Sequence, residues 1–274
     1  MVFLNTINQM NCNKSKLSAI VIILSFFLNV LFLNAQKSKN NIRVEYELIL
    51  NTDVPLTKKG VLIINDGLNK SIFFEILNNK ENKIIEKDND IKIIINNKNK
   101  RFNYADYNNN TLVSTESVIY DEFNVSESIP VLKWKLLDST KTIGNFECKL
   151  ATTSFRGRNY FAWYTEKYPL RFGPWKFNGL PGLIINVYDD TNRYNWIMSS
   201  VKQDSAPFND YLESLENNLD TISIKEFVKK RYGTDLNSKI KSKLPRDASF
   251  VIHKTPRNSK EISFEWEETD NKDD

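Results

Sequence analysis

Apolar and polar side chains alternate along the first half of the chain. From residue 44 to residue 50, apolar side chains stand at every even position and charged ones at most odd positions. This alternation is typical of a strand with one buried and one solvated face. Similar runs recur at short spacing with polar turns between them, which predicts an antiparallel meander. The predicted strands are residues 44–50, 61–64, 72–77, 91–95, 112–120 and 131–137.

Two hairpins are predicted after these strands. In the first, residues 142–153 and 159–165 flank a short connection. Gly157 lies in this connection and is available for the left-handed backbone conformation that such turns require. The second hairpin consists of residues 183–188 and 194–201, around a polar turn.

Helical periodicity is found only late in the chain. Apolar residues recur at spacings of three and four over residues 208–219. Ser223 and Glu226 form a capping-box pattern before a second helix, which Gly233 would end. We place the helical part at about residues 206–243. The chain therefore predicts a mainly β domain with a curved antiparallel sheet or an open barrel and one or two C-terminal helices, and a β-sandwich is the alternative.

Residues 172–185 concentrate turn-forming residues among large apolar ones. Glycine permits positive φ or close backbone approach, and proline fixes φ, so the segment predicts a fixed path and not a flexible loop. We expect it to be a structural motif that sets the register of the following strand, with Gly182 at positive φ. The residues of this motif are Gly173, Pro174, Gly179, Leu180, Pro181, Gly182, Leu183 and Ile184.

The first 35 residues predict export. Two lysines precede an apolar run over residues 17–33, and Ala35 suits the last position before a cleavage site. We therefore expect a signal peptide over residues 1–35 and a single mainly β domain over residues 36–274. An uncleaved membrane anchor is the alternative. Cleavage would leave no membrane span and would place the protein in the periplasm or at the cell surface.

Charge and cysteine content exclude several functional classes. The formal net charge is +4, and loss of the two lysines within residues 1–35 lowers it to +2. This near-neutral balance gives no electrostatic reason to bind nucleic acid or an anionic membrane. Only Cys148 would remain after cleavage, which excludes an internal disulfide and a cysteine zinc site. We expect a buried structural thiol there, with pairing to a second protein as the alternative.

At residues 143–184 the chain resembles a known family. The strings at residues 143–151, 155–158, 162–165 and 173–184 follow one another as they do in the GLPGLI family of exported bacterial proteins, which is named after the six residues at 179–184. Tyr168 departs from the pattern, where a small apolar residue is expected. The resemblance implies a signal peptide and a mainly β domain of unsettled biochemical role. It implies no catalytic residue.

The sequence offers no set of catalytic residues. His253 is the only histidine, and no glycine-flanked serine accompanies it, so a Ser-His-Asp triad has no support. The scarcity of histidine also argues against a zinc hydrolase. Asp189 and Asp190 are interpreted as turn residues and not as cation ligands. We predict no metal and no cofactor.

One group of residues stands out as a binding hypothesis. Two arginines flank the glycine of the first hairpin, and tryptophans and a lysine follow nearby, so together they would form a contact surface for an anion or a carbohydrate. In the structural alternative the tryptophans belong to the core and the arginines bind backbone carbonyls. These residues are Arg156, Arg158, Trp163, Trp175 and Lys176.

The function predicted from these features is non-catalytic binding by an exported envelope protein. A hydrophobic ligand, a lipid or an envelope partner protein would bind in the concavity of the sheet. The oligomeric state stays open. The alternative is a hydrolase that uses carboxylates alone, which requires paired Asp or Glu residues to converge in a pocket.

Overall fold

The computed structural model describes residues 41–76, 101–118, 121–233 and 257–267, together with the backbone of residues 83–87 and 90–94. The predicted signal peptide, His253 and the predicted helical region after residue 233 lie outside the described residues. None of the described helices is long and apolar enough to cross a membrane.

A single sheet of twelve strands dominates the described residues. In chain order these strands are β1 (Asn41–Leu50), β2 (Leu56–Asn65), β3 (Lys70–Ile76), β6 (Arg101–Asp106), β7 (Thr111–Val118), β8 (Asp121–Ser128), β9 (Lys135–Ile143), β10 (Phe146–Phe155), β11 (Arg158–Thr165), β12 (Leu183–Asp189), β13 (Tyr194–Asp204) and β14 (Thr221–Ser223). Their order across the sheet is β14-β8-β7-β6-β3-β2-β1-β13-β12-β11-β10-β9. β4 (Lys83–Lys87) and β5 (Asp90–Ile94) form a separate antiparallel hairpin.

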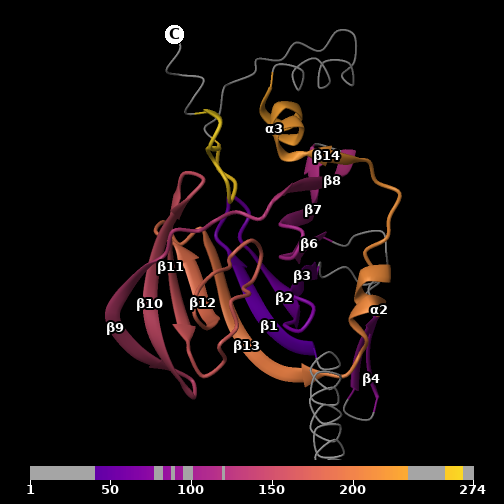
Figure 1. Ribbon diagram of the computed structural model, residues 1–274. Helices are drawn as coiled ribbons and strands as arrows, with labels where there is room; N and C mark the ends of the chain where they lie inside the picture. Colours follow the sequence, from indigo (N-terminus) through magenta and orange to yellow (C-terminus); the bar gives the residue numbers. More distant parts are fainter. Residues whose placement is uncertain are drawn as a thin grey trace, which may run out of the picture. The chain divides into compact units, whose positions relative to one another are not determined.

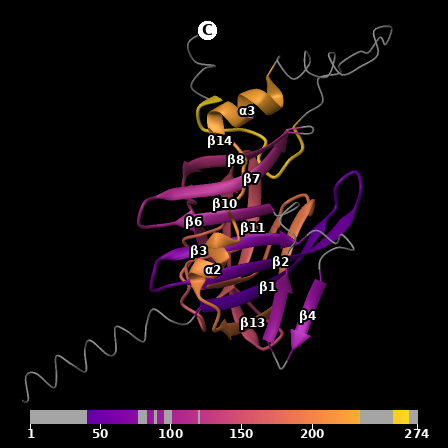
Figure 2. The same ribbon diagram turned by 90° about the vertical axis from the view of Figure 1, so that its right-hand side faces the viewer.

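The large sheet is curved and open. β9 to β12 form one arm, β3 and β6 to β8 form the other, and β1, β2 and β13 lie at the bend between them (Figure 1). Figure 2 shows the second arm and the strands of the bend as a stack from β8 down to β1. The neighbouring strands are antiparallel except for β14, which runs parallel to β8. The two outermost strands, β9 and β14, do not pair with each other, so the predicted curved sheet is confirmed and the β-sandwich is wrong.

Alternation explains why the strands at the bend form. On β1, Val44, Tyr46 and Leu48 are fully buried and the residues between them are less so, as the sequence predicts. β2 is buried on both faces from Gly60 onward. Its even-numbered apolar residues enter the main core inside the curve, and its odd-numbered ones enter a second core under helix α2 (Phe208–Glu213). Figure 1 shows α2 beside the outer face of the second arm.

The second helix, α3 (Ile224–Tyr232), packs on the end of the second arm. Ser223 caps it, because its hydroxyl oxygen accepts a hydrogen bond of 3.2 Å from the Glu226 amide. Ile224, Phe227 and Val228 form a small core with β7, β8 and Phe264 of the C-terminal segment, which comprises residues 257–267. The two predicted helices are therefore present, but α2 ends at Glu213, before residue 219 where the pattern placed its end.

Several strand predictions need correction. The sequence pattern missed β6 and β8, where polar residues such as Asn103 and Asn124 interrupt the apolar alternation. The predicted strand at residues 131–137 is wrong over its first half, because β9 begins only at Lys135. The predicted strand at residues 142–153 is in fact the end of β9 and most of β10, and Gly144 turns the chain between them at φ 56°.

Candidate functional site

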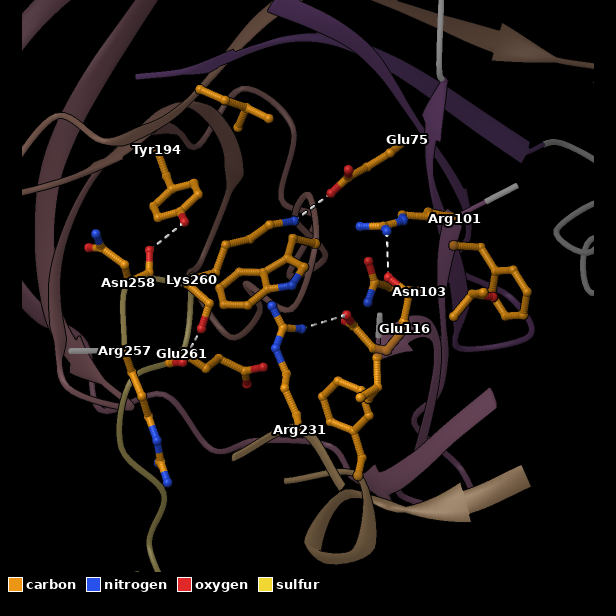
Figure 3. Close-up of a pocket in the computed structure, with 18 of the residues that line it drawn as sticks. Glu75, Arg101, Asn103, Glu116, Tyr194, Arg231, Arg257, Asn258, Lys260 and Glu261 are labelled. Carbon is orange, nitrogen blue, oxygen red and sulfur yellow. Dashed lines mark hydrogen bonds and ion pairs between the residues drawn. The ribbon is translucent and has the colours of Figure 1, made fainter. Parts of the chain in front are cut away.

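A cavity of about 720 Å³ lies inside the curve of the sheet. Strands β3, β6 and β7 form one wall, and the C-terminal segment faces them, with α3 nearby (Figure 3). Aromatic rings of Trp175 and Tyr194 also line the cavity, together with neutral polar groups of Asn103 and Ser117. The charged lining residues are the cations Lys58, Arg101, Arg231, Arg257 and Lys260 and the carboxylates Glu75, Glu116 and Glu261.

Side chains of β11 and β13 hold the C-terminal segment in place through its backbone. The hydroxyl of Tyr160 donates to the Lys260 carbonyl at 2.9 Å, and the hydroxyl of Tyr194 donates to the Asn258 carbonyl at 2.9 Å. Arg158 Nε donates to the Ser259 carbonyl at 2.8 Å, and Arg158 Nη1 also binds the fully buried Asp189 at 2.9 Å. Arg158 therefore has a structural role at this position.

A buried ion network lies behind the cavity wall. Lys176 Nζ contacts Glu127 at 2.6 Å and Glu261 at 2.9 Å. Arg156 binds the same two carboxylates, with 2.6 Å to Glu127. The side chain of Lys176 is 1% exposed and that of Arg156 5%, so two buried cations are balanced by the buried Glu127 and the mostly buried Glu261. The exposed Glu265 also binds Arg156.

The network fixes the protonation states of its members. Burial opposes ionisation of Glu261, but Lys176 and Arg156 outweigh it and hold the pKa of this carboxyl below its usual range. Burial also opposes the charge on Lys176, but Glu261 and Glu127 raise its pKa above the ordinary value. Glu261 thus anchors the C-terminal segment as a charged group.

Two of the three carboxylates that line the cavity, Glu75 and Glu116, lie in contrasting surroundings. Glu75 lies 3.4 Å from Lys58 and also binds Lys260. Burial opposes its ionisation, but the two lysines outweigh it and lower the pKa of Glu75 to about 2. Among the described residues, Arg231 is the cation within ion-pair distance of Glu116, at 4.0 Å. Burial raises the pKa of Glu116, against the opposing effect of nearby cations, and Glu261 adds to the increase.

The segment of residues 172–185, called the turn motif below, places Trp175 at this site. Residues 171–179 fold into a tight loop, in which the Gly179 amide donates to the Arg171 carbonyl at 2.8 Å. Trp175 has φ 53°, a strained conformation for a bulky residue. Its ring stacks on Trp196 with 5.9 Å between centroids, and Phe177 packs edge-on against both. The loop therefore fills the concave face with aromatic rings and leaves Trp175 at the cavity.

The prediction that Gly182 needs positive φ is wrong. Gly179 has φ 87°, whereas Gly182 is not in the left-handed region. Gly182 is required because of close approach: a Cβ atom there would lie 2.2 Å from the backbone oxygen of Thr165. Gly173 is similar, since a Cβ atom would lie 2.7 Å from the Phe177 carbonyl oxygen. Gly157 has φ 82° in its hairpin turn, as expected.

The structure separates the five residues of the binding hypothesis. Trp175 lines the cavity, and Arg156 and Lys176 lie next to it in the buried network. Arg158 supports the C-terminal segment. Trp163 is not among the residues that line the cavity, and Lys141 Nζ lies 4.1 Å from its ring centroid. Cys148 is buried, and burial raises the pKa of its thiol.

Sequence reasoning missed the acidic side of the site. Glu116 occupies the same face of β7 as Leu112 and Val118, so an isolated acid on the apolar face of a predicted strand was a usable signal. Glu75 likewise follows Phe73 on one face of β3. Glu261 carries no local signal, because it reaches the site only when the C-terminal segment folds back.

Comparisons with known proteins place this chain near proteins of unsettled function. A model of a family described as "Protein of unknown function (Porph_ging)" matches residues 156–186. This range includes all five residues of the binding hypothesis and the whole turn motif. No curated protein matches the sequence.

Several solved structures are similar over about two thirds of this chain. One is PNGF-II, with a TM-score of 0.49 and 17% identity over 70% of this chain and 33% of that chain. Another is the MucA/MucB complex of Pseudomonas aeruginosa, with a TM-score of 0.35 and 8% identity over 66% of this chain and 57% of that chain. A third is a putative outer membrane lipoprotein-sorting protein domain from Vibrio parahaemolyticus, with a TM-score of 0.25 and 9% identity over 68% of this chain and 97% of that chain. The chain spans about a third of the length of PNGF-II.

Proposed function

We propose that this protein is an exported envelope protein that binds a polar small molecule, without catalysis, in the cavity inside the curved sheet. The observation that carries the proposal is the cavity itself. Its volume of about 720 Å³ falls within the range of small-molecule sites, and its wall combines aromatic rings with convergent polar groups. Export is supported by the predicted signal peptide at residues 1–35.

We also propose membership of the GLPGLI family. The six residues at 179–184 that give this family its name lie inside the range matched by the model of unknown function. The close approach of Gly182 to the Thr165 carbonyl supports a structural reason for part of that motif.

The cavity wall favours a polar ligand over a hydrophobic one. Eight charged side chains line it, and a fully apolar ligand would remove their water without replacing its hydrogen bonds. Asn103, on β6, and Ser117, on β7, add neutral donors and acceptors. Among the ligand classes predicted from the sequence, a hydrophobic molecule therefore fits this cavity least.

A cavity-filling variant tests this proposal. Asn103→Trp adds a large side chain to the cavity wall, and Ser139→Trp makes the matched change on the exposed edge strand β9. Isothermal titration with glucose, glucuronate, glutamate and citrate should give saturable binding of at least one probe to the wild type. Ser139→Trp should retain that binding and Asn103→Trp should lose it. Equal binding by both variants would place the ligand elsewhere.

A carboxylate-dependent hydrolase is the second candidate. Glu116 and Glu261 line the same cavity, and their pKa values are shifted in opposite directions, as an acid and an ionised partner require in glycoside hydrolysis. Glu261 is already bound by Lys176 and Arg156, which favours the binding function. Release of nitrophenol from a panel of nitrophenyl glycosides, lost in Glu116→Gln, would establish the hydrolase instead.

A further inference from the structure

The geometry points to an oxyanion subsite at one end of the cavity, formed by Lys58, Arg101 and Lys260 around Glu75. The ligand is therefore inferred to carry a carboxylate, sulfate or phosphate group that docks among these three cations. This inference rests on the proposed binding function and specifies the chemistry of its ligand.

Adjacent strands of the bend and the second arm bring three members of the subsite together. Lys58 lies on β2 and Glu75 on β3, and Glu75 pairs directly with Arg101 of β6 in the sheet register. Antiparallel partners in register point to the same face, so these side chains all reach the cavity. Lys260 comes from the C-terminal segment on the opposite side, and Figure 3 shows Lys260 and Arg101 converging on Glu75.

The subsite holds more positive than negative charge. Lys58 and Lys260 both bind Glu75, each at a different carboxylate oxygen. Arg101 donates to the Ser117 hydroxyl at 2.8 Å, and none of the described carboxylates lies within ion-pair distance of it. Three cations against one carboxylate leave a surplus of 3 − 1 = 2 positive charges.

The rest of the cavity does not neutralise this surplus. Arg257 donates two hydrogen bonds of 2.7 Å to the Glu267 carboxylate, and Arg231 lies 4.0 Å from Glu116. Glu261 is held by the cations of the buried network. Lys58 is only 11% exposed, so water screens the local repulsion poorly. The lowered pKa of Glu75 reflects the same positive field.

The donor geometry selects an oxyanion over a simple halide. An arginine presents a planar fork of N–H groups that matches the paired oxygens of carboxylate, sulfate or phosphate. Arg101 uses one of its terminal nitrogens for Ser117, which fixes the orientation of the fork beside the cavity. Lys58 and Lys260 supply additional point charges. The Trp175 ring, 5.5 Å from Lys260 Nζ, flanks the body of the ligand.

Isothermal titration of the full chain tests the subsite. The probes are sulfate, phosphate, glucuronate and neutral glucose, at constant ionic strength adjusted with sodium chloride. We expect at least one oxyanion to bind more tightly than chloride, and the comparison of sulfate, phosphate and glucuronate identifies the preferred group. Arg101→Gln and Lys58→Gln should each weaken that binding about tenfold or more, because each removes a charge next to the anion.

Two further variants separate a specific site from general surface charge. Lys59→Gln changes the next residue of β2, which is exposed on the opposite face, and should leave oxyanion affinity unchanged. Glu75→Gln removes the internal carboxylate that competes for the lysines and should tighten oxyanion binding, an effect that a purely structural role would not produce. If Arg101→Gln fails to fold, Arg101→Lys retains the charge, loses the fork and should still weaken binding.

Three results would overturn the inference. The first is oxyanion binding no tighter than chloride binding, and the second is equal weakening by Lys58→Gln and Lys59→Gln. The third is glucuronate binding that Asn103→Trp abolishes and Arg101→Gln leaves intact. That third result would remove the subsite and keep the cavity as a binding site, so it distinguishes this inference from the proposed function on which it rests.

Discussion

Gly182→Ala should destabilise the protein more than Gly179→Ala, although only Gly179 has positive φ. At Gly182 a single methyl group would lie 2.2 Å from the Thr165 carbonyl oxygen and 2.7 Å from its carbon, both backbone atoms that cannot rotate away. At Gly179, with φ 87°, a Cβ atom meets no heavy atom within 4 Å. One substitution therefore creates a clash and the other only backbone strain.

The two costs differ in size. A residue with a side chain in the left-handed region costs roughly 1–2 kcal/mol, which is the expected loss for Gly179→Ala. A rigid clash forces β11 and the turn motif apart, and overpacking of this kind costs about 3 kcal/mol or more. The loss for Gly182→Ala should also include hydrogen bonds of the register that joins Thr165 to Leu183.

Equilibrium unfolding in urea, followed by tryptophan fluorescence, measures both values. The motif carries Trp175 into the aromatic cluster with Trp196, so the signal reports on this region. A free energy of unfolding for Gly182→Ala equal to the wild type, or a smaller loss than for Gly179→Ala, would refute the close-approach explanation of the motif.

Three other outcomes follow from the ion pairs of the site. Lys176→Met should lower the free energy of unfolding by about 3–5 kcal/mol in urea, because it removes a buried cation that Glu127 and Glu261 share. Lys149→Met, at an exposed ion pair, should cost much less. The pKa of Glu75 is lowered from 4.5 to about 2, which stabilises the fold by about 3 kcal/mol above pH 4.5. This stabilisation should disappear as the pH falls from 4.5 towards 2. The free energy of unfolding, measured over a pH series, should therefore fall less steeply in Glu75→Gln than in the wild type. Arg158→Met removes two donors to the C-terminal segment, so limited trypsin digestion should cleave that segment faster than in the wild type, and an unchanged cleavage rate would contradict its structural role.

Much of the fold could be predicted from local patterns. Alternation identified β1, where Tyr46 and Leu48 point into the core, and Ser223 marked the start of α3. β6 and β8 were missed, because their buried positions include residues such as Asn103, whose polarity hides the period. The order of strands depends on pairings between distant segments, such as β1 with β13, that no local pattern encodes.

The site was predictable only in part. Arg156, Trp175 and Lys176 were selected from sequence, and the structure places them at or behind one cavity. Their partner Glu127 is 29 residues from Arg156, and Glu261 is 105 residues from it, so only the folded chain reveals the network. The oxyanion subsite could not be inferred either, because its cations come from β2, β6 and the C-terminal segment.

An anomalous-scattering experiment tests the central claim most directly. A crystal of the full chain soaked in sodium selenate, an oxyanion that scatters anomalously, should show a selenium peak between Lys58, Arg101 and Lys260. The peak should be absent in Arg101→Gln crystals and present in Lys59→Gln crystals. An empty cavity in the wild type, with selenate bound only to exposed surface residues, would contradict the account.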